Sequence, residues 1–374
     1  MKKTIFFILL FLLIFPITVF GETESPDKQM FDETGKQLQK SVTQEAEEFF
    51  EDNGITLEDS TGFTKLSVKD VFGYILKMAK GTLTLPLRLL GMLLAVIVLI
   101  SVVSGMGAVS STAYSKAVDI VGVLVCVKVM FDYIAFCINI TFKTIETGSQ
   151  FMMTYVPVFA SVVGAGGSVT SAAAYHAGVL FIAEIAVQIS VKILMPMLSV
   201  YLAFAILEAV NPELCFSGFA NGIKKGVQWA LGLIMTIFVG LITIQSIIGT
   251  SADTVAIRAA KFAASSFIPV IGGAISDAYT TVKGSLGLLR SGVGTFGIIV
   301  LLLTMLPSII SVTAVKLSVN LAAFVSEIVG VKRLTLLMKN VSSVLSIALS
   351  LLVCFLLMLI ISTTVMMLVG LNMG

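Results

Sequence analysis

The sequence predicts an all-α, polytopic membrane protein, and three observations support this class. Hydrophobic residues make up 57% of the 374-residue chain, and charged residues make up only 12%, about half of the roughly 25% that an average soluble domain carries. Long stretches that are free of charge include residues 89–115, 226–252, 291–315 and 340–374. Each exceeds the roughly 20 apolar residues that a spanning helix needs. A soluble fold could not cover its surface with so few charges, which excludes a soluble enzyme and a nucleic-acid-binding protein with a basic face.

The N-terminus has the pattern of a secretory signal peptide. Lys2 and Lys3 precede an almost wholly apolar run over residues 4–15, which Pro16 ends. Small residues before position 22 then allow cleavage near Gly21. We expect either a cleaved signal over residues 1–21 or an uncleaved first span. If the signal is cleaved, the segment that follows lies outside the cytoplasm.

Residues 22–80 form an acidic head with 13 Asp and Glu against 7 Lys, whereas residues 81–374 carry a net charge of +6. Apolar residues recur at helical spacing in two parts of the head, which predicts two amphipathic helices, the second lying on the membrane surface. Phe49 and Phe50 belong to the apolar stripe of the first. The head is then either a docking surface for an extracytoplasmic partner or a small cap that packs on its own membrane domain.

The membrane body can be divided by its charges. Residues 117–140 and 177–210 are apolar but interrupted by charges, so they add two spans to the four charge-free ones. Residues 81–142 then hold the first two membrane helices. Lysines and arginines mark the cytoplasmic side, which places Lys116, Lys224, Lys225 and the 332–339 segment inside. This gives six spans with both termini outside, or eight if residues 177–210 and 295–329 each cross twice.

Two segments, residues 151–165 and 267–281, contain proline and glycine pairs and measure about 23 Å as helices, against a hydrocarbon core of about 30 Å. We predict that both are re-entrant or broken hairpins. They recur as landmarks of an internal repeat over residues 143–250 and 251–374, because three pairs of landmarks are separated by 112, 111 and 114 residues. Such broken segments in corresponding positions are typical of a transport or pore site. The residues that define them are Pro157, Gly166, Gly167 and Pro196 in the first copy, and Pro269, Gly272, Gly273 and Pro307 in the second.

Ionisable and polar groups inside apolar stretches are the candidates for a conduit, because a charge at mid-bilayer costs at least about 2.5–3.5 kcal/mol unless it has a partner or water. Asp277, after the second glycine pair, is the strongest single candidate. Lys128 and Asp132 either serve function or neutralise each other on one helix face. Lys316 and Glu327 either pair with Glu208 or lie near the inner surface. The remaining candidates form a stripe that lines a conduit or joins two helices: Glu184, Gln188 and Lys192.

Catalytic and cofactor motifs are absent from the sequence. It contains no phosphate-binding G-x-x-x-x-G-K-[ST] loop, no H-E-x-x-H and no nucleophile elbow. His176 is the only histidine and the four cysteines form no C-x-x-C pair, so neither a metal site nor a disulfide framework is expected. We therefore expect no enzyme activity, no cofactor and no nucleic-acid partner.

The stretch Phe267-Ile-Pro-Val-Ile-Gly-Gly-Ala-Ile-Ser-Asp277 resembles the stage III sporulation protein AE family of endospore-forming bacteria, and residues 155–174 look like that family's other marked segment. The resemblance implies an integral protein of the mother-cell membrane around the forespore. It implies partners within the stage III sporulation complex, including its ATPase and ring-forming members, and stage II sporulation protein Q across the intermembrane space.

The resemblance leaves two functions open. The chain is either a permease-like conduit subunit needed for late forespore development, or a membrane scaffold that recruits partners through the head or through Lys224 and Lys225. A secondary transporter for a small solute, unrelated to sporulation, is the third hypothesis.

Overall fold

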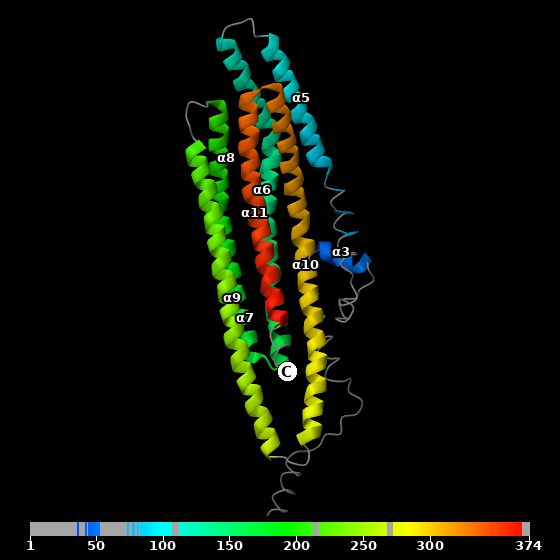
Figure 1. Cartoon of the computed structure of the whole chain (residues 1–374). Helices are drawn as coiled ribbons and strands as arrows, with labels where there is room; N and C mark the ends of the chain where they lie inside the picture. The colour runs from blue at the N-terminus through cyan, green and yellow to red at the C-terminus, as the bar shows by residue number, and fades with distance from the viewer. Residues whose placement is uncertain are drawn as a thin grey trace, which may run out of the picture.

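The structure is a computed structural model that describes residues 36, 42, 44–52, 73–74, 77–78, 81, 83–106, 112–211, 217–267 and 272–368. Within these residues the secondary structure is helical and contains no strand. Six helical segments are long and apolar enough to cross a membrane (Figure 1). The predicted class, an all-α polytopic membrane protein, is confirmed.

The spans are built from seven long helices and a short π-helical segment. The helix bounds are α5 Thr84–Met106, α6 Thr112–Ala165, α7 Val169–Ile189, α8 Met195–Val210, α9 Ser217–Phe267, α10 Gly272–Val329 and α11 Lys332–Leu368. Helices α7 and α8 form one span, because the π-helical residues Ser190–Leu194 continue the chain from one into the other. The described residues therefore contain six candidate spans. Residues 177–210 belong to one candidate span, and residues 295–329 lie within one continuous helix, α10.

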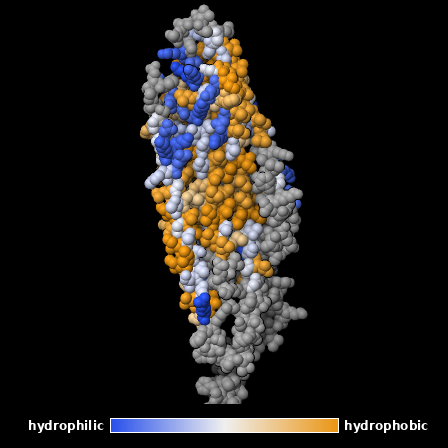
Figure 2. Space-filling model, in the orientation of Figure 1, coloured by the Kyte–Doolittle hydropathy of each residue, from blue (hydrophilic) through white to orange (hydrophobic). Residues whose placement is uncertain are grey.

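Neighbouring spans run in opposite directions, so three junctions lie at one end of the bundle. At the top of Figure 1, α5 ends near the start of α6, α8 near the start of α9, and α10 near the start of α11. Figure 2 shows hydrophilic side chains gathered towards this end on one face, above a broad hydrophobic surface. Lys116, Lys225 and Lys332, which the sequence assigns to one side of the membrane, are exposed near these junctions.

Helix α11 is the centre of the bundle and packs against α6, α8, α9 and α10. It is hydrophobic around its circumference, and its buried residues include Leu345, Leu352 and Phe355. A helix that is apolar on all sides is stable only when other helices surround it. The surrounding helices expose large hydrophobic side chains such as Phe181 and Trp229, as expected of surfaces that face lipid.

Two helical hairpins close through the same glycine motif. At the end of α6, Gly167 has φ +88°, and the N–H groups of Gly167 and Ser168 donate to the carbonyls of Gly164 and Val163. At the end of α10, Gly330 (φ +85°) and the residue after it make the same pair of bonds. This is a Schellman C-cap, which needs a residue in the left-handed region and therefore favours glycine.

The prediction of a re-entrant segment over residues 151–165 is wrong. These residues are the last part of α6, a continuous helix of 54 residues with Pro157 in its interior. The charged positions before residue 151 do not interrupt this helix, so the apolar length counted from the sequence underestimates it. Pro307 likewise lies inside the 58-residue α10. Buried neighbours stabilise both helices enough to tolerate the hydrogen bond that each proline removes.

The second predicted hairpin, residues 267–281, also differs from the expectation, because most of it belongs to a long helix. Gly272 and Gly273 are the first residues of α10, and residues 272–281 belong to that long helix. Pro269 lies outside the described residues. The internal repeat remains a prediction.

The described part of the head is helix α3, Gln44–Asp52, which contacts α10. Phe49 and Phe50 are buried, and the Phe50 ring stacks on Phe296 of α10 with centroids 5.6 Å apart. Glu47, Glu48, Glu51 and Asp52 of this helix are exposed. The burial of both phenylalanines favours the cap over the docking surface, because neither side chain is accessible to a partner. The predicted second helix of the head falls largely outside the described residues.

Candidate functional site

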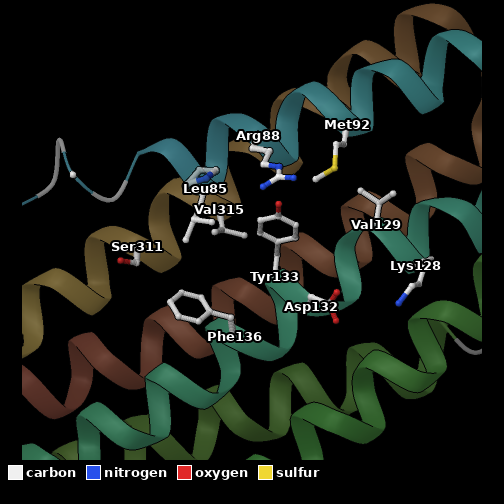
Figure 3. A pocket seen from close by; sticks show the side chains of 12 residues that line it. Leu85, Arg88, Met92, Lys128, Val129, Asp132, Tyr133, Phe136, Ser311 and Val315 are labelled. Carbon is white, nitrogen blue, oxygen red and sulfur yellow. The ribbon is translucent and has the colours of Figure 1, made fainter.

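A cleft of about 630 Å³ lies between α5, α6 and α10. Figure 3 shows Arg88 and Met92 on α5 facing Tyr133 and Val129 on α6, with Ser311 and Val315 contributed by α10. At the edge of the cleft α5 is held against α10, because the carbonyl of Pro86 accepts a hydrogen bond from the Ser318 hydroxyl (2.8 Å).

The cleft combines two cations and one carboxylate with apolar walls. Arg88, Lys128 and Asp132 are exposed, while the Tyr133 side chain is half-buried. None of the three charged groups forms an ion pair among the described residues. The hypothesis that Lys128 and Asp132 neutralise each other is therefore not supported by a close contact. A cleft of this size and composition can hold an amphipathic or zwitterionic molecule, with its polar part on the charges and its apolar part on the walls.

Polar contacts join three helices at the end where α10 meets α11. Arg333 of α11 lies 3.7 Å from the Asp119 carboxylate of α6 and donates a hydrogen bond to the Val210 carbonyl of α8 (2.8 Å). The Asn340 amide donates to the buried Glu208 carboxylate over 3.0 Å. These contacts hold the ends of α6, α8 and α11 together.

The predicted partners of Glu208 and Glu327 differ from the observed ones. Glu327 forms an exposed ion pair with Lys339 at 2.8 Å, and Glu208 is bonded to Asn340 instead of Lys316. Lys316 is half-buried on α10. The pairing prediction was wrong because it considered only charged groups, whereas α11 brings an amide next to Glu208.

The predicted stripe of α7 lies on the outside of the bundle. The Gln188 amide donates to the Glu184 carboxylate over 2.7 Å. Gln188 and Lys192 are exposed, and Glu184 is half-buried. On the adjacent helix α6, Lys143 and Glu146 are exposed as well. The stripe thus does not line a path through the interior of the chain.

Asp253 and Arg290 are polar anchors that sequence reasoning missed. The buried Asp253 carboxylate on α9 accepts hydrogen bonds from the backbone N–H groups of Thr170 (2.8 Å) and Ser171 (3.0 Å) at the start of α7. The Arg290 guanidinium of α10 donates from two of its nitrogens to the carbonyl of Met366, in the last turn of α11. Both anchors join helices far apart in sequence, so no local pattern could identify them.

The structure describes the backbone but not the side chain of one predicted site residue. Asp277 belongs to α10, and its side chain lies outside the described part of the chain. Lys225 is exposed and Lys224 half-buried on the first turns of α9. Among the described residues, no cluster of three or more His, Cys, Asp or Glu could hold a metal ion.

Comparison with known proteins identifies the family. The chain is 26% identical over 265 residues to stage III sporulation protein AE of Bacillus subtilis (strain 168), an alignment that covers 70% of this chain and 65% of the relative. The chain thus matches less than two thirds of the length of that relative. No solved structure matches the chain. The profile of stage III sporulation protein AE matches residues 54–370, and the chain therefore belongs to the stage III sporulation protein AE family.

Proposed function

We propose that this protein is a membrane platform of the assembly that links the mother cell and the forespore. In this role it sits in the mother-cell membrane with its head outside the cytoplasm and binds other proteins of the stage III sporulation complex. Those partners include the ATPase on the cytoplasmic side, the ring-forming members, and stage II sporulation protein Q across the intermembrane space. Family membership supports the sporulation role. The choice of a platform over a self-contained permease rests on the interior of the bundle.

The observation that carries the proposal is the packed, apolar interior. Most side chains in the described core are hydrophobic, the buried polar ones are mainly serines and threonines, and α11 lies on the axis of the bundle. Two cavities between the helices, one beside Tyr175 and one beside Met130, each have a volume of about 10 Å³, room for about one water molecule. A solute path needs polar, hydrated walls, and this interior does not supply them.

The outward placement of polar groups supports the same role. Lys225, Lys332 and Lys339 are exposed at one end of the bundle, where a cytoplasmic partner could bind them under the predicted orientation. A groove of about 530 Å³ between α9 and α11 gives a second outer surface, lined mainly by apolar side chains. Binding surfaces on the outside and a closed inside are the properties of a scaffold.

A second candidate function is binding of a small amphipathic molecule in the cleft between α5, α6 and α10. The observation in its favour is the presence of Arg88, Lys128 and Asp132 in a cavity of about 630 Å³. In this function the protein is permease-like, and the cleft charges are essential to it.

One experiment in the native host separates the two functions. The gene is first deleted, and engulfed forespores are scored for late gene expression; normal spores would refute any role in the sporulation assembly. The deletion is then complemented with Arg88→Gln/Lys128→Gln or with Lys224→Glu/Lys225→Glu, each tagged for measurement of its level. The platform predicts that the cleft variant sporulates normally, whereas the α9 variant is present in the membrane but no longer co-purifies with its partners. Loss of spores from the cleft variant, with partners still bound, would favour the second candidate instead.

A further inference from the structure

A charged stripe faces outward from α6 at a depth where α10 and α11 carry no charge. Lys143, Glu146 and Gln150 are exposed, whereas Thr144 and Gly148 on the other side of the same helix face α10 and α11. The Thr144 and Ser308 hydroxyls share a hydrogen bond of 2.6 Å, and the side chains nearest Gly148 include Phe355 and Leu359.

These contacts fix the depth of the stripe. Ser308 lies eight residues, or about 12 Å, from Lys316 along α10, and 18 residues, or about 27 Å, from Arg290. Phe355 and Leu359 belong to the charge-free part of α11. The carboxylate of Glu146 therefore points outward from the bundle in the middle of its apolar belt.

A matching stripe of polar side chains projects outward from the adjacent helix α7. Glu184 and Gln188 are joined by their hydrogen bond, and Lys192 follows in the π-helical segment. A Cβ added at Gly178 would overlap the Gln245 side chain of α9, so α7 and α9 touch there. Glu184 lies six residues from Gly178, and six residues before Gln245 α9 carries the apolar Val239. Glu184 is thus also at the depth of a charge-free run.

The two stripes match level by level, because α6 and α7 form one hairpin. Counted from the ends that flank the turn, Ala165 and Val169, Gln150 and Glu184 both lie 15 residues away, or about 22 Å. Glu146 and Gln188 both lie 19 residues away, or about 28 Å. At each level one helix carries a carboxylate and the other an amide.

Lipid cannot satisfy these groups. Ionisable side chains within a membrane almost always face the bundle interior, water or a partner. A lysine can extend its charge to the membrane surface along its four-carbon stem, but a glutamate is too short to do so. Glu146 and Glu184, which have no ion pair in the described structure, therefore need protein against them.

The geometry points to a second copy of this chain as that protein: the α6–α7 hairpin is the face through which two copies associate in the membrane. Two copies inserted in the same direction keep every residue at the same depth. When α6 of one copy packs against α7 of the other, Gln150 meets Glu184 and Glu146 meets Gln188. The two-fold axis repeats both contacts, so the same surface patch of each copy pairs with that of the other and each carboxylate meets an amide. A second copy of the chain thus becomes one partner of the proposed platform. The biological meaning of this association rests on the proposed function, but the association itself does not.

Disulfide trapping in native membranes tests the proposal. Two full-length chains with different tags are co-expressed, one with Gln150→Cys and the other with Glu184→Cys, and oxidised with copper phenanthroline. A disulfide requires Cα atoms within about 7 Å, so we expect the 39.7 kDa chain to shift to a band of twice that mass carrying both tags. The matched control replaces Glu184→Cys with Val239→Cys, an exposed position on α9 at the same depth. The four native cysteines are present in every sample.

A second measurement keeps the proposal open to refutation if the disulfide geometry is unfavourable. The mass of the unmodified chain in lipid nanodiscs is compared with that of Gln150→Leu/Gln188→Leu, which removes both amides. We expect a dimer for the first and loss of the dimer for the second. A single copy per nanodisc for the unmodified chain would overturn the proposal, and so would equal trapping by the Val239 control. Because neither assay depends on spore formation, its result is separate from the fate of the proposed function.

Discussion

Replacing Asp253 by alanine should detach the start of α7 from α9. Asp253 is 2% exposed, and its carboxylate binds the N–H groups of Thr170 and Ser171. Ser168, which stands at the cap position of α7, makes no side-chain capping bond. An aspartate from another helix thus performs the capping that a local residue usually provides. Asp253→Ala removes both acceptors and leaves two backbone donors at a helix end.

The expected loss of stability can be calculated from these two hydrogen bonds. A hydrogen bond to a charged group contributes about 1.5–3 kcal/mol, so the pair sets a range of about 3–6 kcal/mol. The helix end lies beside the exposed Val169 and Thr170, where water can reach part of the freed N–H groups. We therefore expect Asp253→Ala to lower the free energy of unfolding by about 3 kcal/mol, the lower end of this range. Asp253→Asn keeps one carbonyl acceptor, and we expect it to lose roughly half as much.

Unfolding in mixed micelles with increasing SDS, followed by far-ultraviolet circular dichroism, measures this loss. The matched control is Ser251→Ala, because the exposed Ser251 hydroxyl bonds only to the Ile247 carbonyl of its own helix. The control should unfold within about 0.5 kcal/mol of the unmodified protein. If Asp253→Ala also remains within that margin, the capping argument is wrong.

Two further predictions concern helix contacts. Gly249→Ala should destabilise the bundle by about 1–3 kcal/mol, since the new Cβ would lie 2.7 Å from Oγ and 2.8 Å from Cα of Ser171; Gly240→Ala on the same helix meets nothing within 4 Å and should be neutral or stabilising in the same SDS titration. Arg290→Gln should release the last turn of α11 by breaking the bonds to Met366. Hydrogen exchange should then accelerate at residues 363–368 and stay unchanged near Gly330, and uniform exchange across α11 would contradict the tether.

The fold class was predictable from composition because hydrophobic content and charge spacing are properties of whole segments. The same charges allowed six spans or eight, and the described residues contain six candidate spans. Lys116, Lys225 and Lys332 are exposed near the starts of α6, α9 and α11. Helix ends were less predictable. Pro157 suggested a break, yet it lies within α6, because packing against several helices outweighs the one hydrogen bond that proline removes.

The candidate site was predicted in part. Glu184 and Gln188 of the predicted stripe lie next to each other and are hydrogen-bonded, since residues four apart on a helix are neighbours whatever the tertiary structure. Whether that pair faces inward or outward depends on the packing of α6 and α9, which no local pattern contains. The same holds for Asn340 beside Glu208 and for the aspartate that caps α7 from another helix.

The length of α9 and α10 has a mechanical consequence. Below the tether at Arg290, α10 continues for 18 residues to Gly272, about 27 Å at the rise of an α-helix, and α9 accompanies it as far as Phe267. Arg258, Lys261 and Lys283 occur in this part of the two helices, and we expect the pair to project beyond the apolar belt as a two-helix arm. An arm of that length acts as a spacer: it keeps whatever binds at its tip roughly one bilayer thickness away from the lipid.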